Sequence, residues 1–256
     1  MVLRVCLAAQ ELGLDLTGVT FSGGGEPVTE AKVRTVRATG ARFYPIYSCS
    51  DTGIIGNGCL NPEGSNDVHL HSDALALIQG RRRVAGPDVD VDAFYFTSLL
   101  PYAPKLLINV ESDDYGYVDQ RDCGCPLFQL GFTTHVRDIR SFSKLTGLGV
   151  SLVGSDAIRV LEEVLPARFG GSPLDYQLAE EEDARGRTTV CLLVSPAIPI
   201  ADEHQVKEVF FQALESDNVA NPFAAGQWKK GDIFRVKRQA PQWVGRGKLL
   251  PLLVPR

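Results

Sequence analysis

The spacing of hydrophobic and polar positions changes twice along the chain, and each part predicts a different kind of structure. The first part predicts, in chain order, an amphipathic helix (residues 1–16), a short strand leading into a glycine loop (16–27), a helix (29–40) and a strand (41–48). Thr29 is suited to cap the second helix and Gly40 to end it. Strand, loop, helix and strand in this order are typical of a parallel α/β layer.

The middle part consists of short β-like runs with turns between them. These runs are VHLHS (68–72), DALALIQG (73–80), DAFYFTSLL (92–100), KLLINVES (105–112) and FQLGFTTHV (128–136). Together they predict an antiparallel or barrel-like β region.

A third part begins near Arg140. It predicts a helix (155–165), two strands (174–182 and 187–196), a second helix (202–216) and a last strand (232–240). Two helices against a small sheet of about three strands make a compact α+β domain. We therefore expect two domains, one formed by residues 1–139 and the other by residues 140–256.

Length and composition exclude some classes of function. The chain has 256 residues, 44% of them hydrophobic, and a net charge of -5, and this mildly acidic balance argues against nucleic acid as the main partner. No apolar run reaches the roughly 18 residues that cross a bilayer, and the first residues do not resemble a secretory signal. Six unevenly spread cysteines indicate a reducing compartment. We expect a cytoplasmic protein with no membrane partner.

Two cysteines, Cys123 and Cys125, stand one residue apart in RDCGCPLF. This spacing is too tight for an ordinary structural disulfide and suits a soft metal ion. Cys59 lies in a glycine-rich turn upstream, and His69 and His71 follow it, so a Cys₃His zinc site is one interpretation. The other is a loop cysteine and two histidines that share one face of a strand. Three thiolates leave a tetrahedral ion room for only one of the histidines.

Four stretches of the chain resemble, in the same order, motifs of the adenylate-forming enzymes. They are SGGGEPVTEAK (22–32) for the Gly-Glu-Pro loop, YSCSDTG (47–53) for the Tyr-Gly-Ser-Thr-Glu motif, ESDDYGYV (111–118) for the Thr/Ser-Gly-Asp motif and GRGKLLP (245–251) for the terminal Gly-Lys motif. With the cysteines and histidines, they resemble the phenylacetate–CoA ligase branch of the acyl/aryl-CoA synthetase superfamily over nearly the whole chain.

The resemblance implies a fold and a reaction. The fold would be an α/β fold: an incomplete α/β layer with a β-rich region, followed by a small mobile α+β domain. In the reaction, a carboxylic acid attacks the α-phosphate of ATP and gives an acyl-AMP and pyrophosphate, and the thiol of CoA then takes the acyl group. ATP or AMP, Mg²⁺, a structural Zn²⁺, CoA and a small-molecule carboxylic acid are the implied ligands.

The resemblance also implies nucleotide-binding residues. Gly25, Glu26 and Pro27 match the loop that packs along the adenine, where glycine lets the backbone approach a flat ring closely. Tyr47 matches the aromatic residue that stacks on the base. Ser50 matches the hydroxyl that contacts the phosphate.

Five further residues match catalytic, ribose-binding and hinge positions. Asp51 matches the acidic residue that helps to hold Mg²⁺, which favours carboxylate and phosphate oxygens. Asp114 matches the carboxylate that accepts hydrogen bonds from the ribose hydroxyls. The hinge segment is matched by Arg140 and Gly149. Arg140 is also one of the candidate nucleotide-binding residues. Lys248 matches the mobile catalytic lysine that stabilises negative charge at phosphorus; taken alone, it would be interpreted as an exposed lysine near the chain end.

The metal ligands that the resemblance implies are Cys59, His69, Cys123 and Cys125. His69 is preferred over His71 because it lies four residues before Asp73, a spacing similar to the His…Asp pattern of the family.

The chain departs from the family pattern in three places. A Ser/Thr/Gly-rich phosphate loop is expected before the Gly-Glu-Pro loop, where this sequence has only a helix. The hinge position that is commonly Asp or Lys is Phe142, and the interval from Pro241 to Lys248 is slightly longer than usual. We therefore expect a truncated or split ligase that needs an N-terminal half, or a homo-oligomer that covers the exposed apolar face. The alternative is a non-catalytic, zinc-stabilised nucleotide-binding or interaction module.

Overall fold

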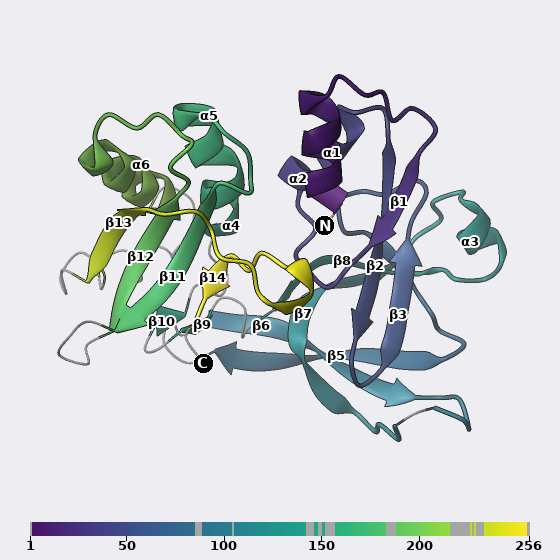
Figure 1. Cartoon of the computed structure of the whole chain (residues 1–256). Helices are drawn as coiled ribbons and strands as arrows, with labels where there is room; N and C mark the ends of the chain where they lie inside the picture. Colours follow the sequence, from purple (N-terminus) through teal and green to yellow (C-terminus); the bar gives the residue numbers. More distant parts are fainter. Residues whose placement is uncertain are drawn as a thin grey trace. The chain divides into compact units, whose positions relative to one another are not determined.

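The computed structural model describes residues 2–84, 89–103, 105–141, 146–147, 150–151, 157–182, 188–215, 226, 228 and 233–254. The chain divides into two compact units, the first formed by Met1–Arg82 and Val91–Ser141 and the second by Arg83–Asp90 and Phe142–Arg256 (Figure 1). Within the described residues, no helix has the length and apolar character needed to span a membrane. The predicted α/β class is confirmed, since both units combine helices with a sheet.

The first unit begins with the predicted α/β layer. Its elements are α1 (Val2–Glu11), β1 (Thr20–Gly23), α2 (Glu30–Arg37) and β2 (Arg42–Cys49), and β1 and β2 pair in parallel (Figure 1). Thr29 caps α2 as predicted, because its side chain accepts a hydrogen bond from the backbone N–H of Lys32. Cys6 of α1, Val36 of α2 and Ala41 form the small core between the helices and these strands.

The α/β layer and the β region share one continuous sheet of eight strands. The strand order is β1-β2-β3-β4-β8-β7-β6-β5. The remaining strands are β3 (Gly53–Gly58), β4 (Val68–Leu70), β5 (Leu75–Val84), β6 (Val89–Ser98), β7 (Val110–Gln120) and β8 (Thr134–Ser141). From β2 to β3, β4, β8, β7 and β6, neighbouring strands pair in antiparallel fashion, which confirms the predicted antiparallel character.

This sheet is strongly curled. Tyr47 on β2 and Asp114 on β7 are four strand positions apart, so a flat sheet would hold their strands about 19 Å apart. The Tyr47 hydroxyl nevertheless donates a hydrogen bond to Asp114 Oδ2 over 2.8 Å. The curl encloses a buried core to which Ile55, Phe94 and Val136 belong.

The second unit contains a four-stranded sheet with helices packed on it. The strand order is β13-β12-β11-β14, from β13 (Phe234–Arg238), β12 (Thr188–Val194), β11 (Tyr176–Glu182) and β14 (Leu252–Leu253). The described helical segments include α4 (Ala157–Arg159), a π-helical turn (Val160–Val164), α5 (Leu165–Phe169), α6 (Glu203–Glu215) and a short 3₁₀ turn (Gly245–Gly247) (Figure 1). A two-residue pair of strands, β9 (Thr146–Gly147) and β10 (Val150–Ser151), completes the unit.

Three sequence predictions about elements were wrong in detail. The run at 105–112 is mostly irregular, and its last residues start β7. The run at 128–136 begins in the short helix α3 (Pro126–Gln129), because Pro126 is pre-organised for a first helical turn. The sheet of the second unit has four strands, since the two-residue strand β14 is too short to give a periodic signal.

Candidate functional site

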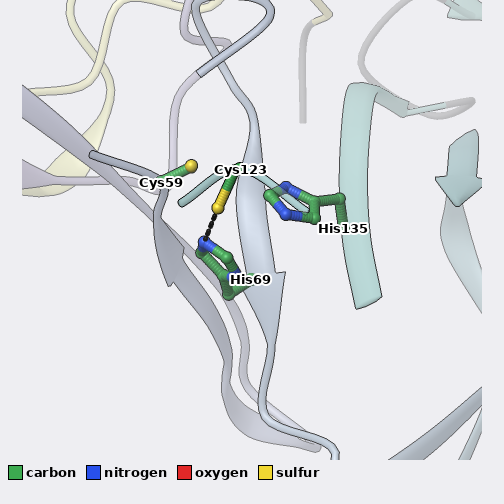
Figure 2. A group of neighbouring side chains, drawn as sticks. All are labelled: Cys59, His69, Cys123 and His135. Carbon is green, nitrogen blue, oxygen red and sulfur yellow. Dashed lines mark hydrogen bonds between the residues drawn. The ribbon is translucent and has the colours of Figure 1, made fainter. Parts of the chain in front are cut away.

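Four cysteine and histidine side chains from separate parts of the first unit meet at one point (Figure 2). Cys59 directly follows β3, His69 lies on β4, Cys123 follows β7 and His135 lies on β8. Their candidate ligand atoms all lie within 4.8 Å of one another, and three of the four side chains are buried. These are the donor types that hold zinc in closed structural sites.

Strand pairing brings the two histidines together. β4 pairs with both β3 and β8, and in the second ladder His69 stands opposite His135 with ring centroids 4.1 Å apart. The backbone of β3 approaches closely on the other side, since a Cβ on Gly56 would lie 2.4 Å from the carbonyl oxygen of His69. Gly124, with φ +66°, permits the sharp turn that aims Cys123 inward.

Each histidine donates its Nδ1–H away from the cluster. His69 Nδ1 lies 2.6 Å from the carbonyl oxygen of Phe132, and His135 Nδ1 lies 2.7 Å from Asp67 Oδ1. A carbonyl or carboxylate oxygen can only accept, so both Nδ1 atoms carry the proton. In the neutral rings, both Nε2 lone pairs are therefore available, which is the tautomer that a metal requires.

A fully buried carboxylate, Asp67, supports His135. Asp67 also accepts hydrogen bonds from Arg121 Nη2 and, over 2.9 Å, from the backbone N–H of Glu63. Arg121 Nη2 lies 3.1 Å from His135 Nδ1 as well, but Nδ1 already holds a proton, so we assign the guanidinium hydrogen bond to Asp67. The Asp67–Arg121 ion pair satisfies a charge that would otherwise be costly to bury.

Cys125, the fourth predicted ligand, lies beside the cluster. Its Sγ is 3.1 Å from His69 Nε2. Burial opposes ionisation of the thiol, but the backbone N–H groups of Phe128 and neighbouring residues and the Cys123 side chain lower the pKa of Cys125 to about 6. Burial is also the main reason why the pKa of Cys59 is raised to about 12.

The residues present fit a zinc-type ion. Imidazole nitrogens and thiol sulfurs are zinc donors, and the buried His135 Nε2 has no hydrogen-bond partner among the described residues. Of the two histidines weighed from sequence, the structure brings His69 into the cluster. His71 Nε2 instead lies 3.0 Å from Asn57 Nδ2. The sequence prediction missed His135 and Asp67, because only the pairing of β4 with β8 reveals them.

Most of the candidate nucleotide-binding residues gather at the carboxyl ends of β1 and β2. The loop Gly25, Glu26 and Pro27 follows β1 and lies against β2, since a Cβ on Gly24 would meet the carbonyl oxygen of Ile46 at 1.9 Å. The Pro27 carbonyl accepts a hydrogen bond of 2.9 Å from Lys32 Nζ on α2, which fixes the loop to the helix. Ligands of open α/β sheets bind at such strand ends.

Tyr47, near the carboxyl end of β2, is hydrogen-bonded to Asp114 on β7. The Tyr47 ring is 8% exposed and makes tilted contacts with Phe94 and Phe96, so its faces are packed in the core. Burial, followed by the negative charge of Asp114, raises the pKa of the Tyr47 phenol far above its ordinary value. The half-buried Asp114 carboxylate therefore faces a permanent hydrogen-bond donor.

Three further candidates of the first unit lie at exposed positions. Ser50 and Asp51 occupy the turn between β2 and β3, and Asp51 pairs with Lys105. Arg140 is exposed on β8, one position before the Ser141 that stands opposite Asp114. The sheet thus holds Arg140 and Asp114 on adjoining strands.

Lys248 belongs to the second unit, where it is half-buried in a tight loop. The loop is closed by pairing between Val244 and Lys248. The fully buried Gln177 of β11 holds both ends of it: its Nε2 donates to the carbonyl oxygens of Gln242 and Leu250 over 3.1 and 2.8 Å, and its Oε1 accepts from the Gln242 N–H over 2.7 Å. The hinge residues Phe142 and Gly149 lie outside the described residues.

No protein-family model and no curated protein matches the chain. Among solved structures, O-succinylbenzoate coenzyme A synthetase from Bacillus subtilis, in complex with ATP and a magnesium ion, is 13% identical with a TM-score of 0.47, over 98% of this chain and 53% of that one. E. coli MenE, with a bound analogue of OSB-AMS, is 10% identical with a TM-score of 0.43, over 96% of this chain and 48% of that one. 2-Hydroxyisobutyryl-CoA ligase, with 2-HIB-AMP and CoA, is 17% identical with a TM-score of 0.39, over 53% of this chain and 32% of that one. The chain spans about a third to a half of the length of these three synthetases.

Proposed function

We propose that the chain forms the rear part of an adenylate-forming acid–thiol ligase that activates an aryl or acyl carboxylate with ATP and passes it to CoA. The observation that carries this proposal is the hydrogen bond between Tyr47 and Asp114. These residues belong to two motifs that lie 67 residues apart and are expected to serve one nucleotide. The glycine loop before α2 and the turn that holds Asp51 lie at the adjoining strand ends.

Each residue group would have a defined task in this reaction. The Asp114 carboxylate would accept hydrogen bonds from the ribose hydroxyls, since an ionised carboxylate is a strong double acceptor. Asp51 would hold Mg²⁺, which neutralises charge on the transferring phosphate. Lys248 would stabilise the negative charge that develops at the α-phosphorus while the acid attacks.

The metal centre would have a structural task. Its candidate ligands come from four segments that strand pairing brings together, so a bound Zn²⁺ would hold β3, β4, β8 and the loop after β7 in place. The phenylacetate–CoA ligase branch is the most specific assignment that this donor set and the four motifs support. We also infer that the phosphate loop comes from an N-terminal half or a second chain.

The first experiment measures AMP binding by calorimetry. Asp114→Asn keeps the shape of the side chain and removes its charge, and hydrogen bonds to a charged group contribute about 1.5–3 kcal/mol. We expect affinity to fall about 10- to 100-fold in this variant and to stay unchanged in the control Asp113→Asn on the same strand. Equal affinities for the wild type and both variants would contradict the nucleotide site.

The second experiment measures acid-dependent exchange of pyrophosphate into ATP, in the presence of a chain that supplies the phosphate loop. We expect Lys248→Ala to abolish the exchange and the control Lys207→Ala on α6 to preserve it. The alternative function, a non-catalytic zinc-stabilised module, is favoured by the burial of the Tyr47 ring. It predicts one zinc per chain and no exchange with any acid.

A further inference from the structure

Five metal-binding side chains surround a point where a tetrahedral ion needs four. Cys59, His69 and Cys123 belong to both possible sets. The fourth ligand is either Cys125, which the C-x-C spacing suggests, or His135, which the sheet brings into the cluster. Structural zinc is almost always four-coordinate, so the two compete for one position.

Distances to His69 Nε2 separate the two cysteines of the C-x-C pair. Zn–S and Zn–N bonds of about 2.3 and 2.0–2.1 Å at tetrahedral angles put a ligand nitrogen and a ligand sulfur about 3.5 Å apart. Cys123 Sγ lies 3.6 Å from His69 Nε2 and meets this expectation. Cys125 Sγ lies at 3.1 Å, the distance of a hydrogen bond and about 0.4 Å short of this expectation. It is also not among the four ligand atoms that lie within 4.8 Å of one another.

His135 shows three signs of a ligand. Its Nε2 is buried and lacks a hydrogen-bond partner among the described residues, an arrangement that is destabilising unless something binds there. Its Nδ1–H is held by Asp67, so the free lone pair is at Nε2. Its ring is fixed beside His69 by the β4–β8 pairing.

The surroundings of Asp67 form a second layer of support. The carboxylate is fully buried and is held by Arg121 and by the Glu63 N–H, so it cannot turn away from His135. A carboxylate that orients a histidine toward a metal is a recurring arrangement, and its loss typically weakens metal binding 10- to 100-fold. No comparable carboxylate is needed at Cys125, where backbone N–H groups already contact the sulfur.

We propose that His135 is the fourth metal ligand, completing a Cys₂His₂ set with Cys59, His69 and Cys123, and that Asp67 is its positioning residue. Cys125 then stays outside the coordination sphere, where backbone N–H groups contact its sulfur. This inference rests on the metal centre of the proposed function. It is independent of whether the chain carries out adenylation.

X-ray absorption spectroscopy of the wild-type chain loaded with Zn²⁺ tests the assignment without any substitution. We expect two sulfur and two nitrogen neighbours, with the outer-shell scattering of two imidazoles. Three sulfurs and one nitrogen would overturn the inference and leave the proposed metal centre standing. Less than one zinc per chain under reducing, metal-replete conditions would overturn both.

Variants give a second readout through competition with a zinc chelator. His135→Asn and Asp67→Asn should each weaken zinc binding at least 10-fold, whereas Cys125→Ser should change it less than 3-fold. In the Co²⁺-loaded protein, the thiolate-to-cobalt absorption of Cys125→Ser should match that of the wild type. Loss of one thiolate's share of this absorption in Cys125→Ser would overturn the inference. If the Asp67 variant does not fold, the wild-type absorption spectrum still decides.

Discussion

The substitution Tyr47→Phe removes a single oxygen atom from the contact that links β2 to β7. The ring keeps its packing against Phe94 and Phe96, so no cavity forms. The lost hydrogen bond reaches a carboxylate over 2.8 Å, and such bonds contribute about 1.5–3 kcal/mol. Asp114 is only half-buried and can recover part of this from water. We expect the first unit to lose about 1–2 kcal/mol at pH 7.5.

The same substitution should change how stability depends on alkaline pH. Burial, and then the charge of Asp114, raise the pKa of Tyr47 in the folded chain, whereas in the unfolded chain it ionises near pH 10. Above pH 10 the unfolded state therefore binds fewer protons, and wild-type stability falls by about 1.4 kcal/mol per pH unit from this group. Tyr47→Phe lacks this slope, so its deficit should shrink between pH 10 and 11.

The two tryptophans allow the two units to be followed separately. Trp228 and Trp243 both belong to the second unit, so tryptophan fluorescence reports that unit alone, while tyrosine absorbance and circular dichroism also follow the first unit. In Tyr47→Phe we expect the unfolding temperature of the first unit to fall by about 3–8 °C and that of the second unit, followed by tryptophan fluorescence, to stay unchanged. Tyr117→Phe, at a 59% exposed side chain, is the control. Equal stabilities of Tyr47→Phe and Tyr117→Phe at pH 7.5 would refute the reasoning.

Two further substitutions test how the backbone positions the candidate sites. Gly56→Ala should destabilise the first unit by about 1–3 kcal/mol and weaken zinc binding, because its Cβ would meet the carbonyl oxygen of His69. The control Gly64→Ala, which has open space around it, should change the free energy of unfolding by less than about 0.5 kcal/mol. Equal effects of the two substitutions in chemical denaturation would contradict this. Gln177→Leu should leave three backbone groups unpaired, and hydrogen exchange should become faster in the loop that carries Lys248; unchanged protection there would show that Gln177 does not hold the loop.

Local sequence patterns predict much of this fold because many of its determinants are local. The cap at Thr29, the periodic apolar positions of α2 and the glycine loop before it are visible within a few residues of each other, and β1, α2 and β2 form as predicted. The helix α3 was not expected, since its four residues are too few for a periodic pattern. The single curled sheet was not expected either, because no local feature states that β4 pairs with β8.

The candidate site shows the same limit. The C-x-C pair attracts notice because its spacing is unusual within one short stretch, and Cys59 and His69 lie in one neighbourhood of the sequence. His135 becomes visible only through the register between β4 and β8, which joins residues more than 60 positions apart. Asp67 in a turn would ordinarily be interpreted as a solvated carboxylate, and only its complete burial beside Arg121 reveals its task.

The β4–β8 pairing also has a consequence for synthesis on the ribosome. β4 leaves the ribosome well before β8, and at about 5–20 residues per second the roughly 65 intervening residues take several seconds. During this interval one edge of β4 is unpaired, and His69 and Cys59 lack His135, which lies on β8. The nascent chain therefore passes through a stage with an unpaired strand edge and an accessible thiol. At this stage a chaperone could bind the strand edge, and a metal donor could reach the thiol, more easily than in the folded chain.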